Sequence, residues 1–219
     1  MSMILMGLLW SAEAAALEGI TGQWLPGASP VAQGQGWVSA GGAWDWPGGQ
    51  GEGVLVRGVV GIGAKTALNA EGHLSLTDPF TDLNLGLRTI VLRNAGVQLA
   101  PFIHLGFGGD GLDGTAGLAG QLNGDAITAD ASIGLIGFTA NDGDTGGTFT
   151  LPPEAMRVFE GGVAFAPAKR QELRLGLLSR DQAWFTVGYR WKGPWWLISG
   201  DLLFWPGDLG ARAMAGVRF

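Results

Sequence analysis

The stretch that decides the fold is LGARAMAGVRF, residues 209–219. Its residues alternate between an apolar set and a set made of glycine, arginine and one methionine. Successive side chains of a β-strand point to opposite faces, so this alternation predicts a strand with one apolar face. The apolar face holds Leu209, Ala211, Ala213, Ala215, Val217 and Phe219, and the opposite face holds Gly210, Arg212, Met214, Gly216 and Arg218.

The same period-2 alternation recurs along the chain from Trp37 onward. It predicts an all-β fold of twelve strands, with ten as the alternative count. The boundary at Lys65/Thr66 is open, since one long strand could replace two. The predicted strands are 37–46, 54–65, 66–77, 82–93, 96–108, 114–123, 125–140, 157–167, 170–180, 182–192, 194–205 and 209–219.

The composition excludes several classes of protein. Of 219 residues, 40 are glycine, only 15% are charged and 47% are hydrophobic, which excludes a disordered chain and argues against a helical bundle. The formal net charge of −6 gives no basic footprint for nucleic acid. The absence of cysteine excludes disulfides and thiolate metal sites.

The N-terminal region differs in character from the rest of the chain. Residues 1–16 combine an apolar run with small residues after it, which predicts a signal peptide; an amphipathic helix is the alternative. Residues 17–36 are predicted to form an irregular periplasmic lead-in, and 37–219 the β-barrel. No apolar run reaches the length of about 18 residues that a membrane-spanning helix needs.

The predicted connections are short after every second strand, whereas the longest ones follow the other strands. Asn123-Gly124, in one of the short connections, is typical of a tight hairpin turn. Short turns at one end and longer loops at the other predict a transmembrane antiparallel up-and-down barrel rather than a Greek-key sandwich. Eleven residues tilted by about 40° span roughly 28 Å, which matches a hydrocarbon core of about 30 Å.

The face opposite the apolar band combines glycine with isolated charges of both signs. A soluble sandwich would show a polar face rich in lysine, glutamate, serine and threonine. Glycine and mixed charges suit a narrow lumen instead, where opposite charges pair. The predicted lumen-lining residues are Arg57, Arg88, His104, Asp130, Glu160, Glu172, Arg174, Arg190, Asp201 and Arg212.

Aromatic residues gather near the ends of the predicted strands. Tryptophan favours the membrane interface because its ring is apolar while its N–H needs a polar partner. The alternative is that these residues form the core of a soluble β-protein. The predicted interface residues are Trp37, Trp46, Trp191, Trp195, Trp196, Trp205 and Phe219.

The last strand, ending in Gly216-Val217-Arg218-Phe219, resembles the C-terminal signature of bacterial outer-membrane β-barrel proteins. Residues 74–87, LSLTDPFTDLNLGL, are similar to a hairpin common in that superfamily. The resemblance covers about 185 residues and identifies a class rather than a family. It implies an outer-membrane location, periplasmic termini and recognition of the terminal strand by the barrel-assembly machinery.

The residues offer little sign of catalysis or metal binding. Only His73 and His104 could serve as a general base, and the candidate nucleophiles Ser75, Ser132 and Ser199 give no recognisable triad. The Asp- and Gly-containing loops 109–113 and 141–144 lack the ligand spacing of a calcium loop. We therefore expect no catalytic residues, metal or cofactor.

The lumen is the remaining candidate for function. Unpaired arginines would make it a narrow passive channel for small polar or anionic solutes, which is the function we predict. Complete pairing would make a non-conducting structural or ligand-binding barrel. The sequence also leaves open an outer-membrane lipid hydrolase and a soluble β-sandwich. The expected partner is the lipid bilayer, and no nucleic-acid partner is expected. The sequence does not determine the oligomeric state.

Overall fold

The computed structural model describes residues 31–44, 53–76, 81–94, 96–108, 111–124, 127–140, 156–179, 183–205 and 208–219. The predicted signal peptide, most of the lead-in, Trp46 and the loop 141–144 lie outside these described residues. Among the described residues, no helix is long and apolar enough to cross a membrane.

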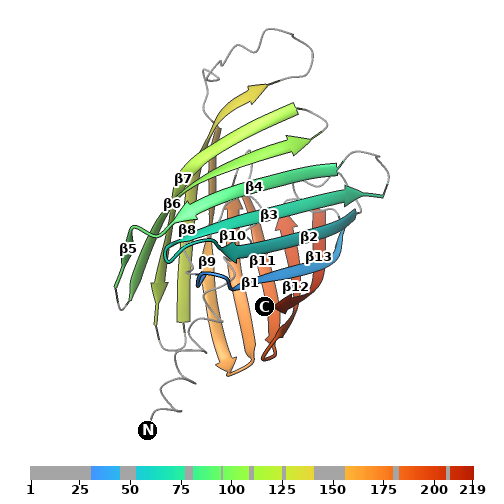
Figure 1. The fold of residues 1–219 in the computed structure, drawn as a ribbon. Coiled ribbons are helices and arrows are strands. Elements are labelled where there is room, and N and C mark those ends of the chain that lie inside the picture. Colours follow the sequence, from blue (N-terminus) through green and yellow to red (C-terminus); the bar gives the residue numbers. More distant parts are fainter. Residues whose placement is uncertain are drawn as a thin grey trace.

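The described chain is built from β-strands in chain order (Figure 1). The first seven are β1 (Gly36–Trp44), β2 (Gly53–Gly61), β3 (Thr66–Ser75), β4 (Thr81–Thr89), β5 (Leu92–Arg93), β6 (Val97–Gly108) and β7 (Gly111–Asn123). The others are β8 (Ile127–Ala140), β9 (Met156–Ala168), β10 (Gln171–Ser179), β11 (Ala183–Lys192), β12 (Trp196–Trp205) and β13 (Asp208–Arg218).

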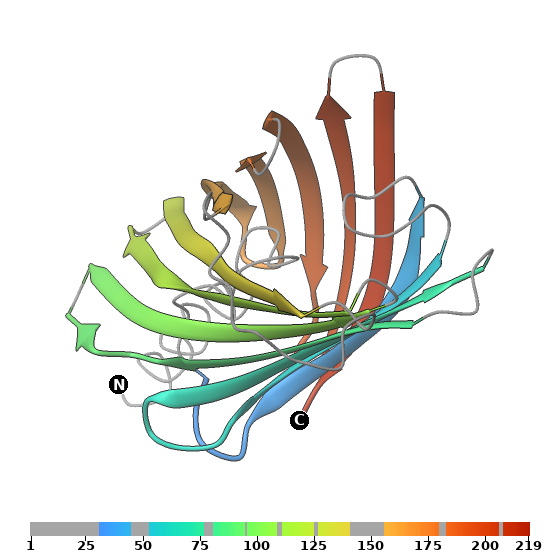
Figure 2. The same cartoon turned by 90° about the horizontal axis from the view of Figure 1, so that it is seen from above.

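These strands form one closed antiparallel barrel (Figures 1 and 2). Each strand pairs with its sequence neighbours, except that β4 and β5 do not pair with each other, and β1 pairs with β13. Both β4 and β5 pair with β6, so β5 continues β4 after a break at Ile90 and Val91. The ring therefore has twelve strands, as predicted.

The open boundary at Lys65/Thr66 is resolved as a turn between two strands. The backbone N–H groups of Ile62 and Gly63 donate to the carbonyl of Thr66 at 3.0 and 3.2 Å. The predicted strand 82–93, by contrast, is interrupted at its end. There the N–H of Ile90 donates at 2.8 Å to the carbonyl of Lys65, which continues the pairing with β3, whereas the register with β6 shifts by one residue between the pairs Arg88–Phe102 and Leu92–Leu99.

The two faces of each strand separate as the alternation predicts. In β11 the residues Phe185, Val187, Tyr189 and Trp191 are exposed on the outside, while Trp184, Thr186, Gly188 and Arg190 are buried inside. The apolar side chains thus cover the outer surface and the charged side chains line the interior. Lipid imposes this arrangement, because the bilayer core offers polar groups no hydrogen-bond partners.

The barrel has one end where the described connections are short turns, which we call the short-turn end. It holds the turns at 62–65, 169–170 and 193–195, together with the start of β1 and the end of β13. There Gly36 and Phe219 exchange backbone hydrogen bonds of 2.9 and 3.0 Å, which joins the first strand to the last.

Candidate functional site: the barrel lumen

The polar side chains of the lumen come from strands all around the barrel. The structure places all ten predicted lumen residues on the inward face. It also places there charged or ionisable side chains absent from that set, among them Glu71, His73 and Lys192. Glu71 lies opposite Arg57 in the β2–β3 register, two residues from His73 on the same face. Their period-2 spacing in residues 66–77 was the signal that could have found them.

Most of the inward charges whose contacts are described lie in ion pairs between neighbouring strands. Arg57 on β2 pairs with Glu71 on β3. At the β12–β13 seam, with β1 between β13 and β2, Arg212 of β13 donates from Nε at 3.1 Å and from a terminal nitrogen at 2.7 Å to one carboxylate oxygen of Asp201 on β12. Both members of the second pair are 4% exposed, so each depends on the other for charge compensation.

A further ion pair bridges two strands that are not neighbours. Arg174 of β10 lies 3.6 Å from Asp130 of β8, with β9 between them. In the registers, β9 places Ala164 beside Arg174 and Gly162 beside Asp130. Because both intervening residues are small, the guanidinium can extend along the wall to the carboxylate.

Glycines on the inward face make room for neighbouring side chains that lie flat on the wall. A Cβ at Gly188 would overlap the carboxylate of Asp201, and one at Gly53 would overlap the imidazole of His73. A Cβ at Gly117 would likewise collide with the ring of Phe102. The lumen glycines thus create space that side chains from adjacent strands occupy.

Gly188→Ala is expected to destabilise the barrel by about 1–3 kcal/mol, because the new methyl group displaces Asp201 from Arg212. Gly200→Ala is the matched control on the adjacent strand, since its nearest neighbour would be a carbonyl oxygen 3.9 Å away. Urea unfolding of the two variants measures the difference. Equal midpoints would contradict the assigned role of Gly188.

The segment just before β1 lies inside the barrel at its short-turn end. Val31 is buried against Val59 and Ala67, both of which are inward-facing, and Trp37 packs on this cluster. The N–H of Gly34 donates to the carbonyl of Gly61, and the N–H of Gly61 donates to the carbonyl of Gln35, both at 2.9 Å. Gly34 has a φ of 75°, which lets the chain turn from the inner wall into β1.

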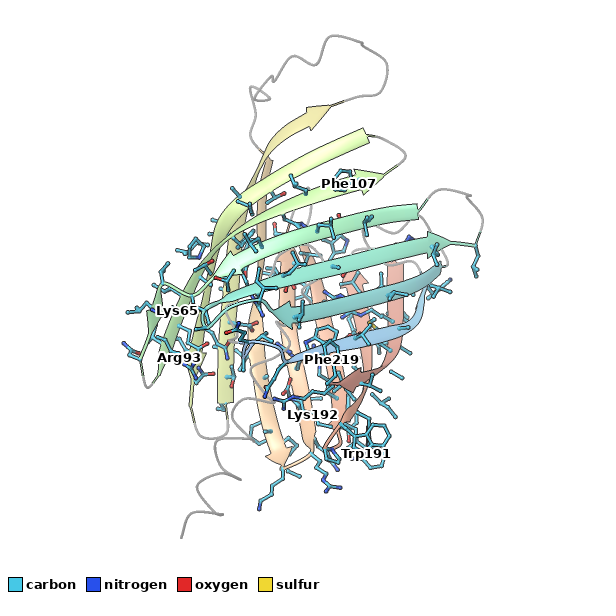
Figure 3. The ribbon with its side chains drawn as sticks, viewed as in Figure 1. Lys65, Arg93, Phe107, Trp191, Lys192 and Phe219 are labelled. Carbon is cyan, nitrogen blue, oxygen red and sulfur yellow. The ribbon has the colours of Figure 1, made fainter. Side chains whose placement is uncertain are left out.

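This packing corrects the expected place of Trp37, which faces inward rather than the membrane interface. Trp191, Trp195 and Phe219 are 49%, 62% and 62% exposed at the short-turn end, and Trp196 meets Trp191 edge to face with centroids 5.6 Å apart. In Figure 3 Trp191 lies beside the end of β11, whereas Phe107, which the prediction omitted, lies near the opposite end of the barrel. The side chains of Trp46 and Trp205 lie outside the described part of the chain.

The two histidines line the inner wall on different strands. His73 on β3 is buried opposite Leu55 in the register, and His104 on β6 lies opposite Gly86 and Thr115. The candidate nucleophiles Ser132 and Ser199 belong to β8 and β12, and neither strand adjoins β3 or β6. The side chain of Ser75 lies outside the described part of the chain. In the described ranges, no group of three or more His, Cys, Asp or Glu residues could hold a metal ion.

A closed barrel with an apolar outer surface and a charged interior is a transmembrane β-barrel of the bacterial outer-membrane type. No protein-family model matches the chain, and no curated protein matches its sequence. Solved outer-membrane proteins do share its fold.

The KdgM porin, solved in complex with disordered oligogalacturonate, has a TM-score of 0.62 and 12% identity over 84% of this chain and 98% of its own. The NanC porin has a TM-score of 0.58 and 11% identity over 83% and 98%. Outer membrane phospholipase A from Escherichia coli has a TM-score of 0.50 and 9% identity over 95% and 97%. These identities establish a common fold.

Proposed function

We propose that the chain forms a narrow passive channel for small polar or anionic solutes in the bacterial outer membrane. The observation that carries this proposal is the set of charged side chains of both signs on the inner wall of a closed twelve-stranded barrel. Barrels of about 8 strands are filled by side chains and those of 16–18 leave a wide aqueous pore, so twelve strands favour a narrow one. The likeness to two porins supports the same function.

The wall presents charges of both signs to a solute. Among the inward side chains that the structure describes, the cations Arg57, Arg88, Arg174, Arg190, Arg212 and Lys192 lie among the carboxylates Glu71, Asp130, Glu160, Glu172 and Asp201. Arg93 and Arg218 add positive charge at the short-turn end, where each pairs in register with an inward residue. Mixed charges in ion pairs offer hydrogen bonds to a polar solute without a strong field of one sign.

Single-channel recording in planar bilayers tests the proposal. We expect stepwise currents in potassium chloride with a modest preference for chloride. A folded barrel that gives no current at any voltage would support the second candidate, a non-conducting barrel. The observation that favours this candidate is the burial of Arg174, Arg190 and Arg212, which are only 3–4% exposed.

We propose that the barrel is not an enzyme. Both histidines face the lumen, whereas an ester of a membrane lipid would approach from the outer surface. Purified protein is expected to cleave lipid esters at the background rate, as are His73→Ala and His104→Ala. Ester cleavage by the natural sequence that either substitution abolishes would contradict this.

We further propose that residues 1–16 direct export and that β13 is recognised by the barrel-assembly machinery. Phe219 is exposed at the end of β13, where its ring is accessible to a partner. Phe219→Ala is expected to lower the amount of folded barrel in membranes, measured by heat-modifiable migration, while the total synthesis stays constant.

A further inference from the structure

The turn between β9 and β10 carries two exposed cations at the short-turn end of the barrel. Lys169 and Arg170 follow each other in the sequence, and both side chains are exposed. Within the described part of the chain, neither side chain belongs to an ion pair. Two adjacent positive charges are thus presented to the surroundings of the barrel.

Exposed tryptophans lie directly beside this turn. The N–H of Lys192 at the end of β11 donates at 2.8 Å to the carbonyl of Arg170, which joins the end of β11 to the turn. Trp191 is 49% exposed, Trp195 in the following turn is 62% exposed, and Trp196 meets Trp191 edge to face. These residues form one surface, which we call the basic–aromatic patch: Lys169, Arg170, Trp191, Trp195 and Trp196.

The indole rings of the patch point away from the lumen. Arg190 and Lys192 turn inward, where both contact the carboxylate of Glu172, Arg190 at 3.4 Å. Trp191 lies between them in the sequence, and alternation places its ring on the outer face of β11. Figure 3 shows this ring beside the end of β11. The patch is therefore placed at the boundary between the outer surface of the barrel and water.

Indole rings and exposed cations at such a boundary match the two parts of a phospholipid. Tryptophan is held at headgroup level, because its ring is apolar and its N–H needs a polar partner. Arginine and lysine next to the membrane attract anionic headgroups, and a guanidinium can donate two hydrogen bonds to one phosphate. A zwitterionic headgroup carries a cation of its own, which the two positive side chains repel.

We propose that the basic–aromatic patch binds the headgroup of an anionic phospholipid in the leaflet at the short-turn end. Lys169 and Arg170 hold the phosphate, while the indole rings lie beside the glycerol and the upper acyl chains. This inference goes beyond the proposed channel and does not depend on conduction.

Lys65 provides the matched control for the charges of the patch. It is an exposed cation in the turn between β2 and β3, at the same end of the barrel. In either direction around the ring, four strands separate this turn from the turn between β9 and β10. Lys65 therefore lies on the opposite side of the barrel, where it cannot share a headgroup with the patch.

Native mass spectrometry of the detergent-folded barrel, titrated with phosphatidylglycerol, tests this inference. In Lys169→Gln/Arg170→Gln, the dissociation constant of the tightest phosphatidylglycerol site is expected to rise at least about fivefold, since the attraction of one Lys or Arg to an anionic lipid surface corresponds to roughly that factor. Lys65→Gln is expected to leave this constant within about twofold. Heat-modifiable migration checks that each variant is folded.

Phosphatidylcholine separates a site for an anionic headgroup from a general apolar surface. It is expected to bind the natural sequence at least about fivefold more weakly than phosphatidylglycerol does. Equal affinity of the natural sequence for the two lipids would overturn the inference. So would an unchanged phosphatidylglycerol affinity in Lys169→Gln/Arg170→Gln, or an equal loss in Lys65→Gln. Because the titration needs no current, a failure of the channel proposal shows separately, in the bilayer recordings.

Discussion

Arg212→Met is expected to destabilise the folded barrel by about 3–5 kcal/mol, because it leaves a buried carboxylate without its counter-charge. Asp201 is 4% exposed and receives two N–H groups from Arg212 at 3.1 and 2.7 Å. The loss is measured as a lower urea midpoint of the barrel folded in lipid vesicles.

The double variant Asp201→Leu/Arg212→Met is the control for this first prediction. A buried ion pair replaced by apolar residues of similar volume is often neutral or even stabilising, so the double variant is expected to unfold later than Arg212→Met alone. If Arg212→Met unfolds at the same urea concentration as the natural sequence, the ion pair between Arg212 and Asp201 does not stabilise the barrel, which contradicts the prediction.

Leu202→Arg is expected to cost about 2–4 kcal/mol, because it places a charge on the lipid-facing surface near the membrane midplane. Leu202 lies in the middle of β12, on the outward face and 44% exposed. If the outer surface faced water instead of lipid, the same substitution at a residue this exposed would change the free energy of unfolding little. Urea unfolding in vesicles, followed by tryptophan fluorescence, measures the cost.

Leu74→Arg is the depth-matched control, because Leu74 is outward and 48% exposed but lies next to the end of β3. A charge near the interface reaches water and headgroups, so its cost is expected to be about 0–1 kcal/mol. Equal costs at Leu202 and Leu74 would mean that the outer surface does not face a bilayer.

The alternation in residues 209–219 was sufficient to predict the face that each side chain of β13 occupies. Strand phase follows from local sequence, because a period of two is fixed by backbone geometry. For the same reason the charges on the inward face could be assigned before any neighbour was known. The prediction that Trp37 lies at the membrane interface was wrong, because a position at the end of a strand does not determine which face of the strand the side chain occupies.

The contacts among the lumen charges could not be predicted, since they depend on register and on strand separation. Nothing in the sequence around Asp130 indicates that Arg174 reaches it across β9. The convergence of Arg190 and Lys192 on Glu172 follows from the β10–β11 register, which places Glu172 opposite Arg190. The inward path of Val31 depends on the positive φ of Gly34 and on contacts with β2 and β3.

Site-directed spin labelling along β13 tests the central claim, that the apolar face of each strand lies in lipid and the charged face in the lumen. The chain has no cysteine, so a spin label attaches only at a single cysteine introduced between positions 211 and 217. In vesicles, labels at Ala211, Ala213, Ala215 and Val217 are expected to collide with oxygen dissolved in the bilayer. A label at Met214, on the inward face, is expected to be shielded from it. Equal oxygen accessibility at odd and even positions, or access of a water-soluble nickel complex to the odd ones, would contradict the account.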